Sequence, residues 1–332
     1  MRAWLSDTPG GPETLTLSER NVAPPAAGEV QIDVHACGIN FPDSLIIRDL
    51  YQYKPPRPFA PGGEVAGIVS AVGDNVAGFA PGDRVLARTG WGGLSETVSI
   101  DQARVAPLPE GMSFAEGSAY LFTYETSYHA LKQRAACRPG DAVLVLGAAG
   151  GTGVSAIEIA KVMGARVVAA VSSEDKAAFV KTCGADDVIV YPRGPLSKEQ
   201  MLALGAEFKA AGGAHGFDIV YDPVGGDYAE PAFRAMAWGG RYLVVGFTAG
   251  IPRLPFNLPL LKGAGIIGVF NGGFSQNEPE ESARNTAELM DLYVTGKLRP
   301  TISSVVPFTD APSAITAIAD RQALGKIVVA VR

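Results

Sequence analysis

The sequence predicts an α/β protein of two lobes, one irregular and mostly β, the other doubly wound around a parallel sheet. Its 332 residues exceed what a single compact core usually organises, since domains cluster near ~100–150 residues. Up to about residue 109 the chain consists of short β-branched stretches separated by Gly and Pro, whereas later strand-like and helix-like stretches alternate. Together these observations predict the fold class.

The composition excludes several functional classes. A hydrophobic fraction of 47% and a charged fraction of 19% are typical of a folded globular chain. With 28 Lys and Arg against 34 Asp and Glu there is no basic stripe, so no nucleic-acid partner is expected. The three cysteines, Cys37, Cys137 and Cys183, are too few and too scattered for a disulfide framework, which favours a reducing cytoplasm. No signal-like or membrane-spanning apolar segment is found, so a soluble protein is expected.

The first lobe is predicted from three β-branched stretches, VQIDVHACGI, EVAGIVSAVG and DRVLAR, with PPAAGE and KPPRPFAPGG as breakers between strands. A helix is then expected over AEGSAYLFTYETSYHALKQRA, because its apolar residues recur at helical spacing. We place the first lobe at residues 1–120.

The second lobe is predicted from an alternation of strands and helices. The strands read as continuous apolar runs (AVLVLG, RVVAAVS, DVIVY, FDIVYDPVG and RYLVVGF), which is typical of a parallel sheet covered on both faces. Helices are expected between them, over TGVSAIEIAKVMG, EDKAAFVKTCG, SKEQMLALGAEFKAAG and EPAFRAMAWGG. We place this lobe at residues 121–265. Residues 266–332 would complete its edge and return to the first lobe.

A glycine-rich loop follows the first strand of the second lobe. Gly147, Gly150 and Gly153 recur at three-residue spacing between a strand and a helix, in DAVLVLGAAGGTGVSAIEIAK. In that context the glycines allow a tight turn, close approach of backbone to a pyrophosphate, and packing of the helix on the strand. The loop therefore predicts a dinucleotide site, with the contacts Gly147, Gly150, Gly151, Thr152, Gly153 and Val154.

The end of the next strand indicates which dinucleotide is bound. An NAD site usually has an acidic residue about twenty positions further on, at this strand end. Here Ser172 and Ser173 stand there, with Lys176 downstream and Tyr191 after the following strand. These groups suit a 2′-phosphate and favour NADPH. The alternative is that Glu174 or Asp175 serves as the acid and Lys176 is solvated. Both acids are expected in the first turn of a helix.

Several segments together resemble the medium-chain dehydrogenase/reductase superfamily and, within it, the zinc-free NADPH:quinone oxidoreductase branch. They are HACGINFPDSLIIRDLY, PFAPGGEVAGIVSAVGDNVAGFAPGDRV, the glycine loop, VIVYDPVGGD and the terminal GKIVV. The resemblance covers nearly the whole chain and implies a GroES-like catalytic lobe with a Rossmann cofactor domain. Glu158 departs from the Gln usual in the branch's glycine-loop signature.

The resemblance also implies roles for individual residues. In zinc enzymes of the superfamily a Cys and a His occupy the positions of Asn40 and Gly63, so no metal is expected here. Asn40 would lie beside the nicotinamide. Either Tyr51 or Tyr53, with Tyr51 matching better, would hydrogen-bond the substrate carbonyl or only line the site. Further cofactor contacts are implied at three positions, Thr126, Phe247 and Thr248.

Other residues that could carry chemistry have simpler explanations. Glu64 and Asp43 are expected to make structural hydrogen bonds within the first lobe. Asp222 could act as a general base, but a turn or cap at its strand end is favoured. His35, His129 and His215 are scattered along the chain and are not expected to bind a ligand together.

The expected function is reduction of a quinone or another conjugated carbonyl by NADPH, without zinc. Two alternatives remain open: reduction of a 2-enoyl thioester, with Lys54 and Arg57 meeting a phosphate-bearing carrier, and a non-catalytic NADPH-binding role. The resemblance implies a homodimer through an edge strand around GAGIIGVF, in keeping with the tendency of apolar sheet edges to pair.

Overall fold

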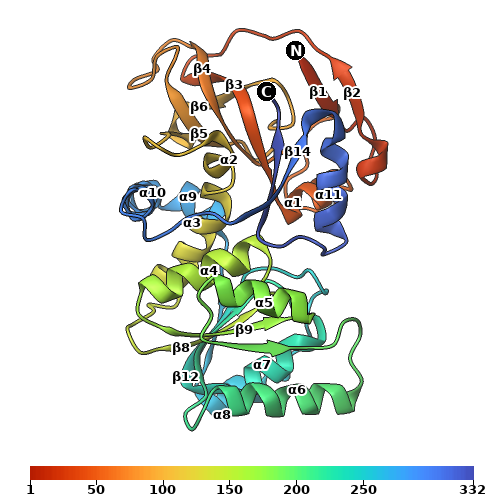
Figure 1. The fold of residues 1–332 in the computed structure, drawn as a ribbon, viewed down its shortest axis with the longest axis vertical. Coiled ribbons are helices and arrows are strands. Elements are labelled where there is room, and N and C mark those ends of the chain that lie inside the picture. The colour runs from red at the N-terminus through yellow and green to blue at the C-terminus, as the bar shows by residue number, and fades with distance from the viewer. The chain divides into compact units, whose positions relative to one another are not determined.

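The computed structural model describes residues 1–332, and the chain divides into two compact units (Figure 1). Unit 1 comprises Met1–Phe122 and Arg299–Arg332, so that both ends of the chain contribute to it. Unit 2 is the continuous segment Thr123–Leu298.

Unit 1 is built on a seven-stranded sheet of order β14-β15-β3-β4-β5-β7, with β6 also paired to β3, and on a separate pair of strands, β1 and β2. The strands are β1 Arg2–Leu5, β2 Thr16–Glu19, β3 Glu29–Ile39, β4 Glu64–Val72, β5 Arg84–Arg88, β6 Thr97–Asp101, β7 Val105–Pro107, β14 Ile302–Pro307 and β15 Lys326–Ala330. The helical segments are η1 Pro12–Thr14, α1 Phe41–Ile46, η2 Gln102–Arg104, α2 Phe114–Gly117, η5 Phe308–Asp310 and α11 Ala311–Ala319.

Strand β3 is the centre of unit 1. Its side chains Val30, Ile32 and Val34 are fully buried, which explains why this β-branched stretch forms the longest strand of the lobe. β3 pairs antiparallel with β15 on one side and with β4 on the other. The C-terminal end of β3 therefore meets the first residues of both neighbours, and the polar residues described below lie at that end.

Unit 2 contains a six-stranded sheet of order β10-β9-β8-β11-β12-β13, in which every pair is parallel. The strands are β8 Ala142–Leu146, β9 Arg166–Val171, β10 Asp187–Val190, β11 Phe217–Asp222, β12 Met236–Val244 and β13 Gly265–Gly268. The helices are α3 Leu121–His129, which begins in unit 1, a π-helical turn Ala130–Arg134, α4 Gly151–Val162, α5 Glu174–Thr182, α6 Lys198–Ala211, η4 Gly226–Tyr228, α7 Ala229–Arg234, α8 Asn257–Lys262, α9 Asn271–Asn277 and α10 Pro279–Val294.

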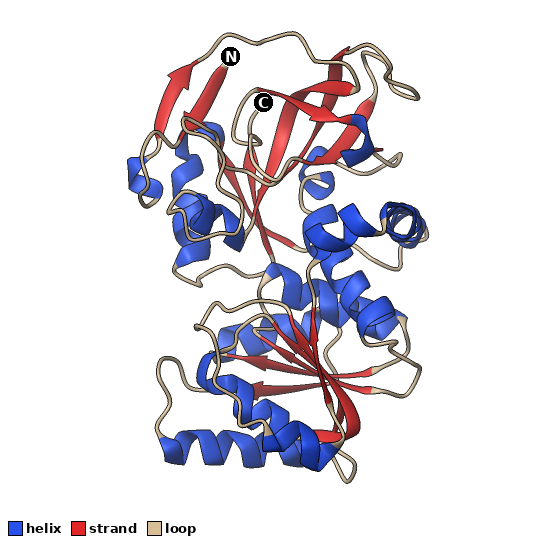
Figure 2. Ribbon diagram, turned by 180° about the vertical axis from the view of Figure 1, so that it is seen from behind, coloured by secondary structure: helices blue, strands red, loops and turns tan.

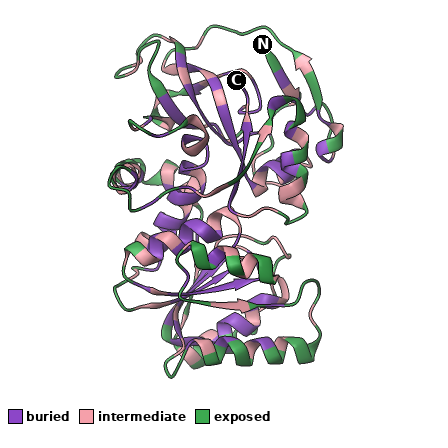
Figure 3. Ribbon diagram, in the orientation of Figure 1, coloured by how far each residue is buried: buried purple, intermediate pink, exposed green.

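Helices cover both faces of the parallel sheet, as Figure 2 shows. Strands β8 and β9 are buried over nearly their whole length, which is why their sequences are continuous apolar runs rather than alternating ones (Figure 3). The strand order reverses between β8 and β11. Ligands of doubly wound sheets bind at such a reversal, beyond the carboxyl ends of the strands. The predicted fold class, an irregular β lobe with a doubly wound parallel sheet, is confirmed.

Two predicted helices differ from the structure. The single helix expected over residues 115–135 is divided into α2, α3 and the π-helical turn, because the chain forms a turn at Ser118, Ala119 and Tyr120 between α2 and α3. The helix expected over EPAFRAMAWGG ends at Arg234, since the chain from Met236 already pairs with β11 as strand β12. None of the helices has both the length and the apolar character needed to cross a bilayer.

Candidate active site

The glycine loop lies directly after β8, at the reversal of strand order. Gly147 has φ +57°, a conformation that favours glycine, and a Cβ there would stand 2.7 Å from Val224 Cγ2. At Gly153 a Cβ would stand 2.5 Å from the carbonyl oxygen of Gly147. These two glycines are therefore required by the turn and by the packing of α4 on the loop.

Gly150 is different, because nothing in the protein requires a glycine at this position. Its φ of −78° and ψ of 167° suit any residue, and the nearest atom to a Cβ there would be the Gly147 carbonyl oxygen at 3.5 Å. As the N-cap of α4, Gly150 also leaves the first N–H groups of the helix without a side-chain acceptor. Open space beside unpaired helix N–H groups is suited to an anion such as a pyrophosphate.

The remaining predicted contacts of the loop belong to the first turn of α4. Gly151, Thr152 and Gly153 follow the N-cap directly, so their backbones form the helix N-terminus. The Val154 side chain is buried in the core, and its N–H already donates to the Gly150 carbonyl at 2.9 Å. A buried hydroxyl network fixes α4 beside α3 and β11: the Ser127 hydroxyl lies 2.8 Å from that of Ser155 and 2.9 Å from that of Tyr221.

A second turn, in the VYDPVGG segment after β11, packs against the glycine loop. The Asp222 carboxylate accepts hydrogen bonds from the N–H groups of Val224 and Gly225 at 2.7 and 2.8 Å and from the Tyr242 hydroxyl. Burial raises the pKa of Asp222 despite these donors. Two of the donors lie two and three residues further along the chain, so the carboxylate stabilises this turn, the role favoured by the sequence.

The residues predicted for a 2′-phosphate gather at the end of β9. The Ser173 hydroxyl caps α5 by accepting from the Lys176 N–H at 3.4 Å, and the Tyr191 N–H donates to the Val171 carbonyl at 2.8 Å, next to the two serines. The Tyr191 ring, however, is buried and packs against Tyr228 with the ring centroids 4.7 Å apart. Sequence reasoning missed Arg193, whose Nε donates to the Ser172 hydroxyl at 3.3 Å. Its position two residues after Tyr191 is the feature of the sequence that could have indicated a cation near the end of β9.

The two acids considered as an alternative, Glu174 and Asp175, directly follow the N-cap Ser173. Both side chains are exposed and lie in the first turn of α5, where their negative charges stabilise the helix by interacting with the positive end of its dipole.

In unit 1, Asn40 belongs to a buried polar cluster. Its Nδ2 donates to Glu64 Oε1 at 2.9 Å, and its Oδ1 accepts from Lys326 Nζ at 2.6 Å. Lys326 also forms a buried ion pair with Glu64. Glu64 Oε2 further accepts from the Phe122 N–H at 3.1 Å. Sequence reasoning did not assign Lys326, although it lies in the GKIVV segment.

Asp43 lies at the edge of this cluster and has a structural role, as expected. Its carboxylate accepts from the N–H groups of Asn40 at 2.7 Å and Gly62 at 3.0 Å, which fixes the start of α1. Burial nevertheless raises the pKa of Asp43 to about 6, because desolvation disfavours the charged form more than the two donors favour it.

Tyr51 and Tyr53 follow α1 with their ring centroids 5.8 Å apart. Burial, reinforced by Tyr53, raises the pKa of the half-buried Tyr51 to about 12. Tyr51 therefore keeps its proton at neutral pH and can donate a hydrogen bond. By contrast, Arg57, considered for a phosphate-bearing carrier, is already held by Asp49 at 3.0 Å and by the Ile47 carbonyl.

The last three predicted contacts lie in unit 2. Thr126 is half-buried on α3, while Phe247 and Thr248 follow the C-terminal end of β12. The Thr248 N–H donates to the Pro223 carbonyl at 3.3 Å, so this loop lies against the turn after β11. Phe247 is 45% exposed, which leaves its ring accessible.

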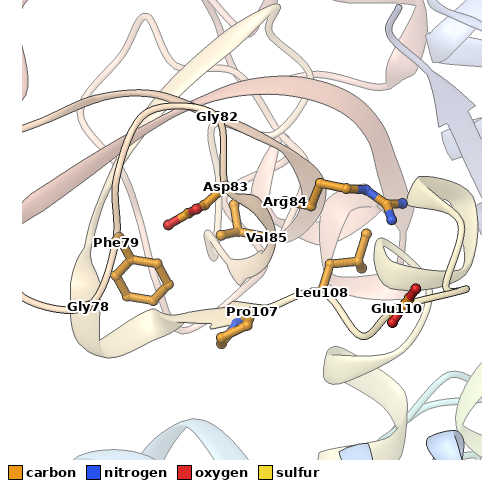
Figure 4. A pocket seen from close by; sticks show the side chains of 9 residues that line it. All are labelled: Gly78, Phe79, Gly82, Asp83, Arg84, Val85, Pro107, Leu108 and Glu110. Atoms are coloured by element: carbon orange, nitrogen blue, oxygen red, sulfur yellow. The ribbon is translucent and has the colours of Figure 1, made fainter.

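A separate surface pocket of about 470 Å³ lies beside β5 and β7 (Figure 4). Its lining includes Phe79, Asp83, Arg84 and Glu110. None of the predicted site residues lines it, so we do not assign the site to this pocket.

The residues present do not fit a catalytic zinc ion. An amide (Asn40) and a glycine (Gly63) occupy the positions where the zinc enzymes have Cys and His, which are the ligands zinc prefers. The Lys326 ammonium already donates hydrogen bonds to Asn40 Oδ1 and to Glu64 Oε1, which are the oxygens a metal at this place would need.

Comparison with known proteins identifies the family. Residues 26–110 match the model of the alcohol dehydrogenase GroES-like domain, and residues 151–288 match that of the zinc-binding dehydrogenases. Quinone oxidoreductase-like protein 2 of Bos taurus is 33% identical over 96% of this chain and 89% of its own length.

Solved structures agree with this relationship. The quinone oxidoreductase of Escherichia coli, solved with NADPH, superimposes with a TM-score of 0.90 at 28% identity over 100% of both chains. The CurK enoyl reductase does so with a TM-score of 0.87 at 26% identity over 99% of both chains. These matches confirm the predicted superfamily and the expectation of an oxidoreductase. The chain belongs to the quinone oxidoreductase family of the medium-chain dehydrogenase/reductase superfamily.

Proposed function

We propose that this protein is an NADPH-dependent reductase that transfers hydride to a quinone or another conjugated carbonyl without zinc. The observation that carries the proposal is Gly150, because neither its backbone conformation nor its surroundings require a glycine, yet it stands at the open N-terminus of α4. A pyrophosphate in van der Waals contact with the backbone of Gly150 would explain why a glycine stands there. The E. coli quinone oxidoreductase solved with NADPH supports the same assignment.

The preference for NADPH rests on the end of β9. Ser172, Lys176 and Arg193 offer hydroxyl and cationic donors there, and the neighbouring acids are exposed on α5. Arg and Lys are the side chains that pair with phosphates through charge-assisted hydrogen bonds. A carboxylate, by contrast, would favour the 2′-hydroxyl of NADH.

For the chemistry, bound NADPH supplies the hydride. Tyr51 is the proposed donor to the substrate oxygen, since its raised pKa keeps the phenol protonated while negative charge develops. Asn40 is the proposed partner of the nicotinamide, and its amide is held by Lys326 and Glu64. A site with Tyr51 and Asn40 but no metal is suited to conjugated acceptors, because the enolate or hydroquinone anion that forms delocalises its own charge.

Reduction of an enoyl thioester is the second candidate function, favoured by the similarity to the CurK enoyl reductase. The cations available for a phosphate-bearing carrier are fewer than the sequence suggested. Arg57 is engaged by Asp49, which leaves the exposed Lys54.

We further propose a homodimer formed through β13. This strand is one of the two edge strands of the parallel sheet, and Ile266 on it is 41% exposed. Nearby apolar side chains are exposed as well, namely Trp238, Leu260, Leu261 and Phe270. An apolar edge strand of this kind is suited to pairing with a second copy.

The test is a turnover screen of the purified protein with NADPH and NADH against quinones, enones and enoyl thioesters. We expect turnover of a quinone or enone with NADPH and no oxidation of ethanol or benzyl alcohol with NADP⁺. Turnover of only the thioesters would favour the second candidate. NADPH binding without turnover of any acceptor would instead indicate a non-catalytic role.

The cofactor assignment has its own test. Lys176→Ala removes a charge-assisted contact worth ~1.5–3 kcal/mol, so NADPH should bind roughly ten- to hundredfold more weakly. Arg193→Ala should have a smaller effect, because this side chain is exposed. NADH binding should be nearly unchanged in both variants, and an equal loss for both cofactors would contradict the assignment.

A further inference from the structure

Asn40, Glu64 and Lys326 form a closed ring of hydrogen bonds, which we call the polar triad. The Lys326 ammonium donates to Asn40 Oδ1 and to Glu64 Oε1, and Asn40 Nδ2 donates to the same Glu64 oxygen. The three residues are 5%, 1% and 3% exposed in chain order. A cation and an anion this deeply buried must satisfy each other, and the amide bridges them.

Strand register brings the triad together. β15 pairs with β3 so that Ile327 lies opposite Ile39, and β4 pairs with β3 so that Glu64 lies opposite Gly38. Lys326 and Glu64 therefore flank the end of β3, from which Asn40 follows. A Cβ at Gly38 would stand 2.9 Å from Glu64 Oε1, so the glycine leaves room for the carboxylate.

The ring also fixes which way the Asn40 amide faces. Only its oxygen can accept from the ammonium and only its nitrogen can donate to the carboxylate. Rotating the amide by 180° would place NH₂ against NH₃⁺ and oxygen against a carboxylate. The charges of Lys326 and Glu64 thus select one of two orientations that would otherwise be similar in shape.

We propose that the Lys326 ammonium is the resident cation of this site, taking the place that a metal has in the zinc enzymes, and that it positions Asn40. A divalent ion bound to residues 40 and 63 would lie beside this ammonium in a buried environment, where like charges repel strongly. The part of the proposal that concerns turnover rests on the proposed function. The part that concerns metal exclusion does not.

Restoring the zinc ligands tests metal exclusion. The double variant Asn40→Cys/Gly63→His carries the Cys and His of the zinc enzymes, and a side chain at Gly63 has space, since its Cβ would stand 3.6 Å from the nearest atoms. Cobalt(II) is titrated into this variant with and without Lys326→Met, and binding is followed by the visible and thiolate absorption bands. Lys297→Met, at an exposed lysine, is the matched control.

We expect Lys326→Met to tighten cobalt binding by at least about tenfold in the restored background, because it removes the competing charge. The Lys297→Met control should leave the affinity unchanged. Equal cobalt affinity with and without Lys326 would overturn metal exclusion. So would stoichiometric zinc in the wild-type protein after incubation with zinc and desalting. These readouts need no turnover, so they stand even if no acceptor is reduced.

The positioning role is tested in the chain with its own Asn40. The double variant Lys326→Met/Glu64→Gln removes both charges together, so no unpaired ion stays buried, and the new side-chain amide can still accept a hydrogen bond from Asn40. With a quinone accepted by the wild type, we expect kcat to fall about tenfold, as when one charged hydrogen bond is lost, and the KM for NADPH to change little. A folded double variant with wild-type kcat would refute positioning by Lys326.

Discussion

Gly150→Ala separates the ligand-binding role of the glycine loop from its structural role. The added methyl meets no protein atom closer than 3.5 Å, and the backbone is already in a conformation open to alanine. Alanine is a poorer N-cap than glycine by some tenths of a kcal/mol, and it reduces the entropy of the unfolded chain by ~0.4–1 kcal/mol. These contributions oppose each other, so the free energy of unfolding should change by less than about 1 kcal/mol.

The same methyl should strongly weaken cofactor binding. If a pyrophosphate lies against Gly150, forced overpacking costs ~1–3 kcal/mol, which corresponds to a roughly five- to 150-fold weaker affinity. NADPH and NADH should lose affinity equally, because both carry the pyrophosphate. The assay is titration of each cofactor by nicotinamide fluorescence, paired with urea unfolding of the same preparation.

Gly153→Ala is the matched control. Its Cβ would stand 2.5 Å from the Gly147 carbonyl oxygen, so this variant should lose ~1–3 kcal/mol of stability even without cofactor. A Gly150→Ala protein that binds NADPH as tightly as the wild type would refute the reasoning. So would a stability loss as large as that of Gly153→Ala.

Four further outcomes are expected. Burial raises the pKa of Asp43 from 3.8 to about 6, so the folded state holds this proton more tightly than the unfolded chain. The free energy of unfolding should therefore fall as the pH rises from about 4 to about 6. Asp43→Asn should lack that part of the fall in urea unfolding at stepped pH. Lys326→Met should cost ~3–5 kcal/mol by leaving the Glu64 carboxylate buried alone, and adding Glu64→Gln should restore much of it in the same assay. Ile266→Lys should convert a dimer into a monomer in light scattering, since a charge on an edge strand opposes pairing. Tyr51→Phe should lower kcat with a quinone by about a hundredfold if the phenol donates to the developing oxyanion, and an unchanged kcat would return Tyr51 to a lining role.

The sequence by itself determined the fold class and the position of the nucleotide loop. Both depend on local information: continuous apolar runs follow from burial on both faces of a sheet, and the glycine spacing follows from a tight turn and a close helix contact. Gly147 and Gly153 can be interpreted in this way from their spacing alone. The same spacing predicts a close approach of the pyrophosphate at Gly150, but only the surrounding atoms show that the protein leaves space there.

Only the tertiary structure decided which side chains meet. Lys326 and Asn40 are 286 positions apart, and they touch because β15 and β4 both pair with β3 in one register. A slip of one residue would turn each side chain to the other face of the sheet, so no spacing within the sequence contains this contact. The hydrogen bonds of Tyr242 to Asp222 and of Arg193 to Ser172 likewise join residues from separate segments of the chain. The pKa of a buried group and the free energy of its ion pairs depend on such partners and on the exclusion of water, which are properties of the packed chain.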